Sequence, residues 1–248
     1  MKIIILSAGK GTRMMPLTKN TPKPLLDIGD GVTIIESQLS SMTGCKGIDE
    51  VVFVIGYRAE QIEAKLKSYK KLPLRFIYNP FFDTTNNLIS LWLAMIQVKE
   101  DFIIINGDNL FKAHLLQSLL DEKRGNCATL VIDHKKKYEE EDMKVISQDG
   151  KILKISKRIP VAEASGESIG MILFTGTARS YFMSIMDQMV REEQSKQIFY
   201  LEAIQRMIDS GYPVYEKLCS PEDWAEVDFH PDLNLVRENM MRYNFFSK

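Results

Sequence analysis

Cations and glycines crowd one short segment near the beginning of the chain. The stretch "LSAGKGTRMMPLTKNTPKPLL" (residues 6–26) contains two glycines and four cationic residues, namely Gly9, Gly11, Lys10, Arg13, Lys19 and Lys23. Backbone N–H groups of a glycine loop can form a concave anion site, and an arginine fork can hold two phosphate oxygens. The segment therefore predicts a site for an anionic ligand.

Two prolines, Pro22 and Pro24, enclose Lys23. Because each proline ring fixes the φ of its own residue, the pair limits the conformations in which Lys23 can be presented. A lysine ammonium is a compact point charge. We therefore expect Lys23 to hold a positive charge at one defined place.

Acidic residues occur at two further places. Asp108 follows the buried-looking run "FIIIN", at the strand end where open α/β sheets bind their ligands; a simple turn with Asn109 is the alternative. In "WAEVDF", Glu226 and Asp228 alternate, so we expect both on one face of a strand. Such carboxylates are costly to bury without a cation, and oxygen ligands favour Mg²⁺ over zinc.

Alternating strand-like and helix-like segments must position these residues. Apolar runs predict strands at residues 2–6, 50–56, 73–79, 101–107 and 127–133, with helical periodicity at 33–42, 59–69 and 87–99. This alternation predicts an α/β fold with a mostly parallel sheet and helices on both sides. Later segments predict a hairpin at 143–156, strands at 168–176, 212–218 and 224–229, helices near 178–193 and 198–210, and a terminal helix from about Asp232.

Composition sets broad limits on the class of protein. The chain has 248 residues, a formal net charge of -1 and three scattered cysteines, Cys45, Cys127 and Cys219. These values predict a cytoplasmic protein without a disulfide framework, a nucleic-acid partner or a membrane partner. The charged run "HKKKYEEEDMK" (134–144) predicts a solvated loop.

The glycine loop departs from two common phosphate-binding motifs. A dinucleotide fingerprint needs a third glycine where Met14 stands, and the P-loop pattern is absent. The fragments "LSAGKGTR", "PLT" and "PKPLL" instead resemble the signature of the nucleotidyltransferases that join a nucleoside monophosphate to a phosphorylated small molecule. The resemblance implies a three-layer, Rossmann-like nucleotidyltransferase fold. A nicotinamide-dependent oxidoreductase and a catalytically silent nucleotide-binding module are the alternatives from other classes.

The same resemblance assigns roles by position. It implies that the loop binds the nucleotide through Ser7, Ala8, Gly9, Gly11, Thr12, Arg13, Lys23 and the region of Tyr57. Lys23, Arg13 and Asp108 are the expected catalytic residues. Asp108, Glu226 and Asp228 match the positions at which the family binds its metal ion, here Mg²⁺.

A later stretch narrows the resemblance. "NPFFDTTNNLISLWLA" (79–94) is similar to the bacterial choline-phosphate and phosphonate cytidylyltransferases, and it lies where the family recognises the base. This implies that Asn86, Asn87 and Ser90 contact the nucleotide. Helix capping by Thr85 or Asn86 is the alternative explanation for part of this motif.

The segment 141–174 also resembles these cytidylyltransferases. It implies that Lys157 binds the acceptor's phosphate, although the family's usual E-K-P is replaced here by "SKR". Glu167, expected in the following loop, is either an acceptor contact or a solvated charge. The aromatic residues available to enclose a quaternary ammonium are Tyr138, Phe199, Tyr200 and Trp224.

The resemblance as a whole implies a CTP-dependent enzyme. CMP would be joined to a small phosphorylated or phosphonate acceptor, such as phosphocholine or aminoethylphosphonate, with release of pyrophosphate. The alternative is a sugar-1-phosphate nucleotidyltransferase that uses UTP, dTTP or GTP. We expect one domain over residues 1–248, with a nucleotide-binding part at 1–133 and an acceptor- and metal-binding part at 134–248. A homodimer is left open.

Overall fold

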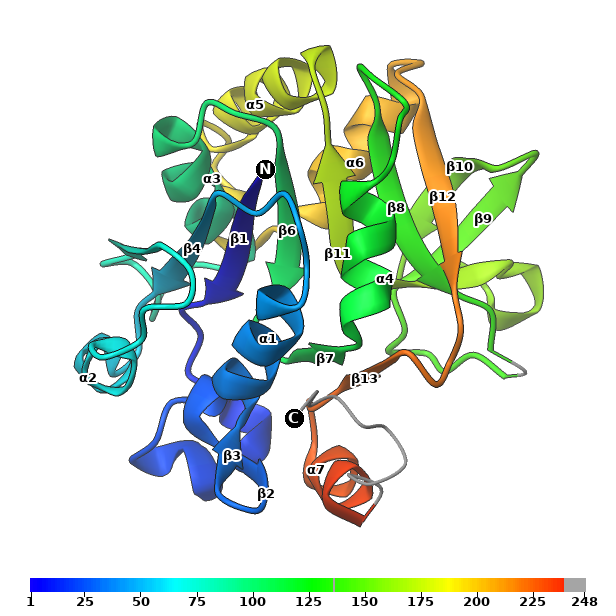
Figure 1. The fold of residues 1–248 in the computed structure, drawn as a ribbon. Coiled ribbons are helices and arrows are strands. Elements are labelled where there is room, and N and C mark those ends of the chain that lie inside the picture. Colours follow the sequence, from blue (N-terminus) through cyan, green and yellow to red (C-terminus); the bar gives the residue numbers. More distant parts are fainter. Residues whose placement is uncertain (136, 239–248) are drawn as a thin grey trace.

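A nine-stranded sheet forms the centre of the computed structural model, which describes residues 1–135 and 137–238 (Figure 1). The strands lie in the order β5-β4-β1-β6-β11-β8-β12-β10-β9. Their bounds are β1 Lys2–Ser7, β4 Glu50–Ile55, β5 Leu74–Tyr78, β6 Phe102–Asn106, β8 Ala128–Asp133, β9 Lys144–Gln148, β10 Lys151–Ser156, β11 Gly166–Phe174 and β12 Val214–Cys219. The predicted α/β fold is confirmed.

The sheet is parallel in its first half and mixed in its second. Strands β5, β4, β1 and β6 pair in parallel, so their carboxyl ends meet at one edge. Strand β11 runs antiparallel to both β6 and β8, and β9 forms the predicted hairpin with β10. The start of β11 and the end of β8 therefore lie at the same edge as the ends of β1 and β6.

Helices cover both faces of the sheet. Their bounds are α1 Ile34–Thr43, α2 Ala59–Leu66, α3 Asn87–Gln97, α4 Ala113–Leu120, α5 Thr177–Met189, α6 Leu201–Asp209 and α7 His230–Glu238. Because alternate strand residues point to opposite faces, Ile4 packs with α3, α5 and α6, whereas Ile3 and Ile5 pack with α1, α2 and α4. Figure 1 shows α1 and α4 in front of the sheet.

A small third core supports the carboxyl edge. It joins the segment after the glycine loop to the C-terminal part through Met14, Ile28, Leu110, Val227 and Leu233. Two short ladders flank it, β2 Asp27–Gly29 with β3 Val32–Thr33, and β7 Asn109–Phe111 with β13 Trp224–Glu226. Residues from the first 30 positions and the last 30 described positions are thereby held together.

Two boundaries near the end of the described chain differ from the sequence prediction. Strand β13 ends at Glu226, and α7 begins at His230 rather than near Asp232. The Asp232 carboxylate accepts hydrogen bonds from the backbone N–H groups of Asp228 and Phe229, at 2.9 and 2.6 Å. This acceptor satisfies N–H groups next to the helix start, which explains why the strand stops early.

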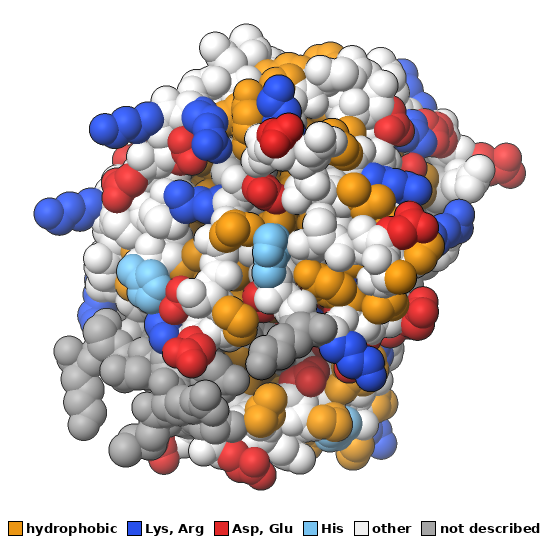
Figure 2. Space-filling view, turned by 90° about the vertical axis from the view of Figure 1, so that its right-hand side faces the viewer, with side chains coloured by type: hydrophobic (Ala, Val, Ile, Leu, Met, Phe, Trp, Pro, Cys, Tyr) orange, Lys and Arg blue, Asp and Glu red, His pale blue; other side chains and the backbone are white. Residues whose placement is uncertain are grey.

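The outer surface carries charges of both signs. Figure 2 shows acidic and basic side chains interspersed with scattered hydrophobic ones on the face that it draws. Among the described residues, no helix is long and apolar enough to cross a membrane.

Candidate active site

A cleft of about 1020 Å³ lies at the carboxyl edge of the parallel strands. The glycine loop after β1, the turn after β6, the start of α3 and the ends of β8 and β13 all contribute to its lining. The predicted site residues that line it are Ser7, Ala8, Gly9, Gly11, Thr12, Arg13, Lys23, Asn86, Asn87, Ser90, Asp108, Lys157, Glu167, Glu226 and Asp228. Residues from distant parts of the chain thus meet in one place.

The glycine loop is fixed by hydrogen bonds to one carbonyl. Gly11 adopts a left-handed conformation, with φ 60° and ψ 42°, which favours glycine. Its carbonyl accepts hydrogen bonds from the Met14 N–H and the Thr18 hydroxyl, at 2.9 and 2.7 Å. The loop is therefore shaped before any ligand binds.

The turn after β6 requires a glycine as well. A Cβ at Gly107 would lie 2.4 Å from the Leu6 carbonyl oxygen and 2.6 Å from the Ser7 hydroxyl. This close approach brings the β6 turn, with Asp108 on it, directly against the end of β1. Asp108 lies just past the strand end, as predicted.

Tyr57, which the resemblance assigns to the nucleotide site, is not among the residues that line the cleft. Its hydroxyl donates to the carbonyls of Thr18 and Lys19, at 3.1 and 2.6 Å, and its backbone N–H donates to the Ala8 carbonyl at 2.9 Å. Tyr57 therefore supports the glycine loop and the segment after it from behind.

Lys23 stands at the centre of the charged groups. Its ammonium lies 2.7 Å from Asp108 Oδ2 and 3.0 Å from Asp228 Oδ1. Burial alone would lower the pKa of Lys23, but the two carboxylates outweigh it and raise the pKa above its ordinary value. Lys23 is therefore a firmly charged cation held between two carboxylates, which fits the defined position predicted for it.

Arg13 joins the same group from the rim of the cleft. Its guanidinium forms an ion pair with Asp228, and the guanidinium carbon lies 5.3 Å from the centre of the Phe229 ring. The side chain is about half exposed. In this structure the fork that we expect to bind phosphate is directed at a carboxylate, so an anion must compete with Asp228 for it.

The late acidic pair is arranged differently from the prediction. Glu226 ends β13, and Asp228 lies beyond the strand, so the two do not alternate along one strand face. Withdrawal from bulk water and the nearby Asp108 and Asp228 carboxylates raise the pKa of Glu226 above its ordinary value. The Glu226 side chain remains exposed to solvent in the cleft, so we attribute much of this effect to the neighbouring charges.

These carboxylates can be assessed as ligands for a divalent cation. Among the described residues, no group of three His, Cys, Asp or Glu side chains is positioned to hold a metal ion. Asp108 and Asp228 do place oxygens around one cationic centre, the Lys23 ammonium. Mg²⁺ is commonly bound by one or two carboxylates together with substrate phosphates. The two carboxylates therefore fit Mg²⁺ once the Lys23 ammonium moves away from between them.

The motif before α3 has a strong structural role. Asn86 is the N-cap, and its side chain accepts a hydrogen bond from the Asn87 N–H at 2.8 Å. The Asn87 side-chain oxygen accepts from the Tyr200 N–H at 2.9 Å, and the Ser90 hydroxyl accepts from the Asn79 amide at 2.9 Å. Capping thus explains Asn86, while the other two tie α3 to its surroundings and still line the cleft.

Glu167 and Lys157, which the resemblance assigns to the acceptor, have other surroundings than the sequence predicts. Glu167 lies in β11 rather than in a loop, is 5% exposed, and forms an ion pair with Lys135. Burial raises the pKa of Glu167 to about 7, although Lys135 opposes this. Lys157 lies 3.2 Å from Glu141, with its ammonium 5.9 Å from the centre of the Phe199 ring.

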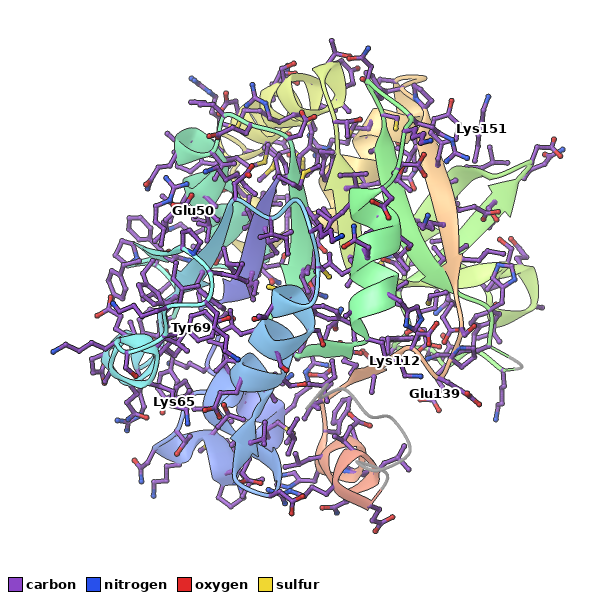
Figure 3. All side chains as sticks on the ribbon, viewed as in Figure 1. Glu50, Lys65, Tyr69, Lys112, Glu139 and Lys151 are labelled. Carbon is purple, nitrogen blue, oxygen red and sulfur yellow. The ribbon has the colours of Figure 1, made fainter. Side chains whose placement is uncertain are left out.

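The charged run at 134–144 is only partly a solvated loop. Lys144 is fully buried in β9, and its ammonium donates to the carbonyls of Glu139, Glu140 and Asp142, at 3.1, 2.9 and 3.3 Å. Figure 3 shows Glu139, which also lines the cleft, at the end of the sheet near β7 and β13. The run therefore forms part of the cleft wall.

Sequence reasoning missed Asp133. It ends β8, is 2% exposed, lines the cleft, and accepts a hydrogen bond from the Trp224 ring N–H at 2.9 Å. A polar residue at the carboxyl end of an apolar strand is the same signal that identified Asp108. The run "CATLVID" (127–133), which ends in Asp133, carries this signal as well.

The fold is α/β, and its cleft brings cations and carboxylates together at the carboxyl edge of the parallel strands. The sequence matches the nucleotidyl transferase family over residues 2–239, and the chain belongs to that family. It is therefore an enzyme of the nucleotidyltransferase class, which sets aside the oxidoreductase alternative.

Among related proteins, several are cytidylyltransferases. The chain is 28% identical over 223 residues to a choline-phosphate cytidylyltransferase of Streptococcus pneumoniae, covering 83% of this chain and 94% of that one. It is 24% identical over 214 residues to a 2-aminoethylphosphonate cytidylyltransferase of Lancefieldella rimae, covering 83% and 79%. A glucose-1-phosphate uridylyltransferase of Haloferax volcanii matches over 53% of this chain and 54% of that one, at 30% identity.

The fold also matches solved structures. The CTP:phosphocholine cytidylyltransferase from Streptococcus pneumoniae superposes with a TM-score of 0.82 at 24% identity, covering 96% of this chain and 98% of that one. The nucleotidyltransferase fold implied by the sequence is therefore confirmed.

Proposed function

We propose that this enzyme joins CMP from CTP to a small phosphorylated or phosphonate acceptor, such as phosphocholine or aminoethylphosphonate, and releases pyrophosphate. The observation that carries the proposal is the position of Lys23 between Asp108 and Asp228, with Arg13 beside them. One cleft thus combines cations suited to a triphosphate with carboxylates suited to a divalent cation. The cytidylyltransferases among the related proteins support CTP as the nucleotide.

The proposed reaction needs no nucleophile from the protein. An oxygen of the acceptor's phosphate or phosphonate attacks the α-phosphorus in line, and pyrophosphate leaves with the electron pair of the broken P–O bond. Because the attacking oxygen is already ionised at pH 7, a general base is not required. Catalysis then rests on orientation and charge neutralisation, with Lys23 at the α-phosphate and Arg13 on the outer phosphates.

A divalent cation fits the same site. Asp108 and Asp228 would hold Mg²⁺, with Glu226 next to them. Bound there, the ion would neutralise charge on the phosphates. Its arrival would also relieve the repulsion between these carboxylates.

The remaining lining residues divide into three groups by their place in the cleft. We assign Ser7, Ala8, Gly9, Gly11 and Thr12 to the phosphates, Asn86, Asn87 and Ser90 to the base, and Lys157 and Glu167 to the acceptor.

A pyrophosphate-release screen tests the proposal. CTP, UTP, dTTP and GTP are each paired with phosphocholine, aminoethylphosphonate, inositol phosphate and hexose 1-phosphates in the presence of Mg²⁺. We expect release with CTP and a phosphocholine- or phosphonate-type acceptor. The Asp108→Asn variant, purified in parallel, controls for contaminating transferases. Release confined to UTP, dTTP or GTP with a hexose 1-phosphate would instead assign the enzyme to the sugar-nucleotide branch.

A further inference from the structure

Two buried carboxylates face each other at the acceptor end of the cleft. Asp133 on β8 and Glu167 on β11 are direct partners in the antiparallel ladder, which places their side chains on the same face. They are 2% and 5% exposed, and both line the cleft. Like charges directly opposite each other destabilise a sheet unless a cation compensates.

One oxygen of this carboxylate pair, on Asp133, accepts no hydrogen bond from the described residues. Asp133 Oδ2 accepts from the Trp224 ring N–H, but Asp133 Oδ1 has no hydrogen-bond partner among the described residues. A buried carboxylate oxygen without a donor is unfavourable. The aspartate therefore lacks a donor in the absence of a ligand.

The nearby lysines only partly compensate these charges. Lys144 is the partner of Glu167 on β9, yet its ammonium is used by three backbone carbonyls. Lys135 pairs with Glu167, and its ammonium also lies 3.4 Å from both oxygens of Asp142. The Lys135 ammonium is therefore shared between Glu167 and Asp142, while Asp133 Oδ1 accepts no hydrogen bond from either lysine. Lys135 also shows that an ammonium group can lie against Glu167.

We propose, on the basis of the proposed function, that the Asp133–Glu167 pair binds a protonated primary amino group of the acceptor. A primary ammonium has three N–H donors, so it can satisfy Asp133 Oδ1 and compensate both carboxylates. A trimethylammonium group has the charge but no N–H, and a hydroxyl group has a donor but no charge. The subsite therefore selects aminoalkyl phosphates or phosphonates over choline-type and polyol acceptors.

The position of the pair suits this role. Asp133, Glu167 and Glu226 all line the same cleft, so the amine subsite and the transfer site adjoin. An acceptor with a short chain between its amine and its phosphorus can therefore reach both. Trp224 connects the two sites directly, because it belongs to β13 and bonds to Asp133.

A matched set of acceptors tests the subsite in the unmodified enzyme. We compare kcat/KM for 2-aminoethylphosphonate, 2-hydroxyethylphosphonate and the N,N,N-trimethyl derivative of the first compound, using the best nucleotide from the screen. A charge-assisted hydrogen bond predicts at least about a tenfold preference for the primary amine over each analogue. Equal turnover of the hydroxyl compound, or a preference for the trimethyl compound, would overturn the proposal while leaving nucleotidyl transfer intact.

Variants locate the preference at these residues. Asp133→Asn and Glu167→Gln keep the size of each side chain and remove its charge, so the preference should fall to within about threefold. The control is Asp149→Asn, an exposed residue in the turn between β9 and β10. Figure 3 shows Lys151, which follows this turn, far from the part of the molecule that contains β7 and β13. An undiminished preference in a folded Glu167→Gln variant would contradict the assignment, even if Asp133→Asn fails to fold.

Binding separates failure of the subsite from failure of the proposed function. If no nucleotide and acceptor react, the proposed function fails. Calorimetric titration of the three acceptors into the CTP-containing enzyme then decides the subsite alone. Tighter binding of the primary amine supports the subsite, and equal or absent binding of all three refutes it.

Discussion

Replacing Lys23 with alanine should reduce turnover severely while leaving the fold intact. Its ammonium lies 2.7 Å from Asp108 and 3.0 Å from Asp228. Because its side chain is only 11% exposed, bulk water does not readily take the place of the lost ammonium. Loss of one preorganised charge at the reacting phosphate typically costs ~3–4 kcal/mol, or about 10²–10³ in kcat. We expect kcat, measured by pyrophosphate release, to fall by that factor.

The same variant should reveal the coupling between Lys23 and a divalent cation. Without the ammonium, two partly buried carboxylates repel each other, which should lower stability by about 1–3 kcal/mol in EDTA. Mg²⁺ should restore more of the melting temperature in Lys23→Ala than in the wild type. Lys19→Ala, which removes an exposed cation from the same segment, is the matched control. Turnover within about threefold of wild type, with normal melting, would refute the role of Lys23.

Further changes test other parts of the account. Asp108→Asn and Asp228→Asn should each abolish Mg²⁺-dependent activity, whereas Glu226→Gln should reduce it less; activity that persists in EDTA would rule out the metal site. CTP should exceed UTP in kcat/KM by roughly 5- to 150-fold, since one unpaired buried group costs about 1–3 kcal/mol; equal values would count against cytosine recognition. Burial raises the pKa of Glu167 to about 7. Between the ordinary pKa of a glutamate and pH 7, the folded protein therefore binds more protons than the unfolded chain. Stability should therefore fall as pH rises through this window, and melting curves of Glu167→Gln should show a shallower fall. Gly107→Ala should lower the melting temperature, because the new Cβ would meet the carbonyl oxygen of the end of β1; unchanged melting would show that the turn can relax.

Local sequence predicted much of the fold and part of the site. Strands β1, β4 and β6 of the parallel half are almost continuous apolar runs, so their pattern predicts them directly. Asp108 could be placed in the cleft because the residue after a buried strand must emerge at the sheet edge. The enclosing prolines likewise singled out Lys23 within its own segment.

Contacts between distant segments could not be predicted in the same way. Arg13 and Asp228 are 215 positions apart, and their ion pair depends on the small core that joins the two ends of the described chain. The sequence predicts a loop at Glu167, but the residue lies in β11. Its burial is set by the register of β11 against β8, which the residues around Glu167 in the sequence do not specify. The supporting role of Tyr57 depends on the path of the chain behind the glycine loop, which no local pattern specifies.

Mass spectrometry of the product tests the central claim most directly. The purified enzyme is incubated with CTP, aminoethylphosphonate and Mg²⁺, with phosphocholine in a parallel reaction. The account predicts a product with the mass of CMP plus the acceptor minus one water, formed together with one pyrophosphate. It would be contradicted if CTP yields no such product with any phosphorylated or phosphonate acceptor, while UTP or dTTP and a hexose 1-phosphate yield a nucleotide sugar.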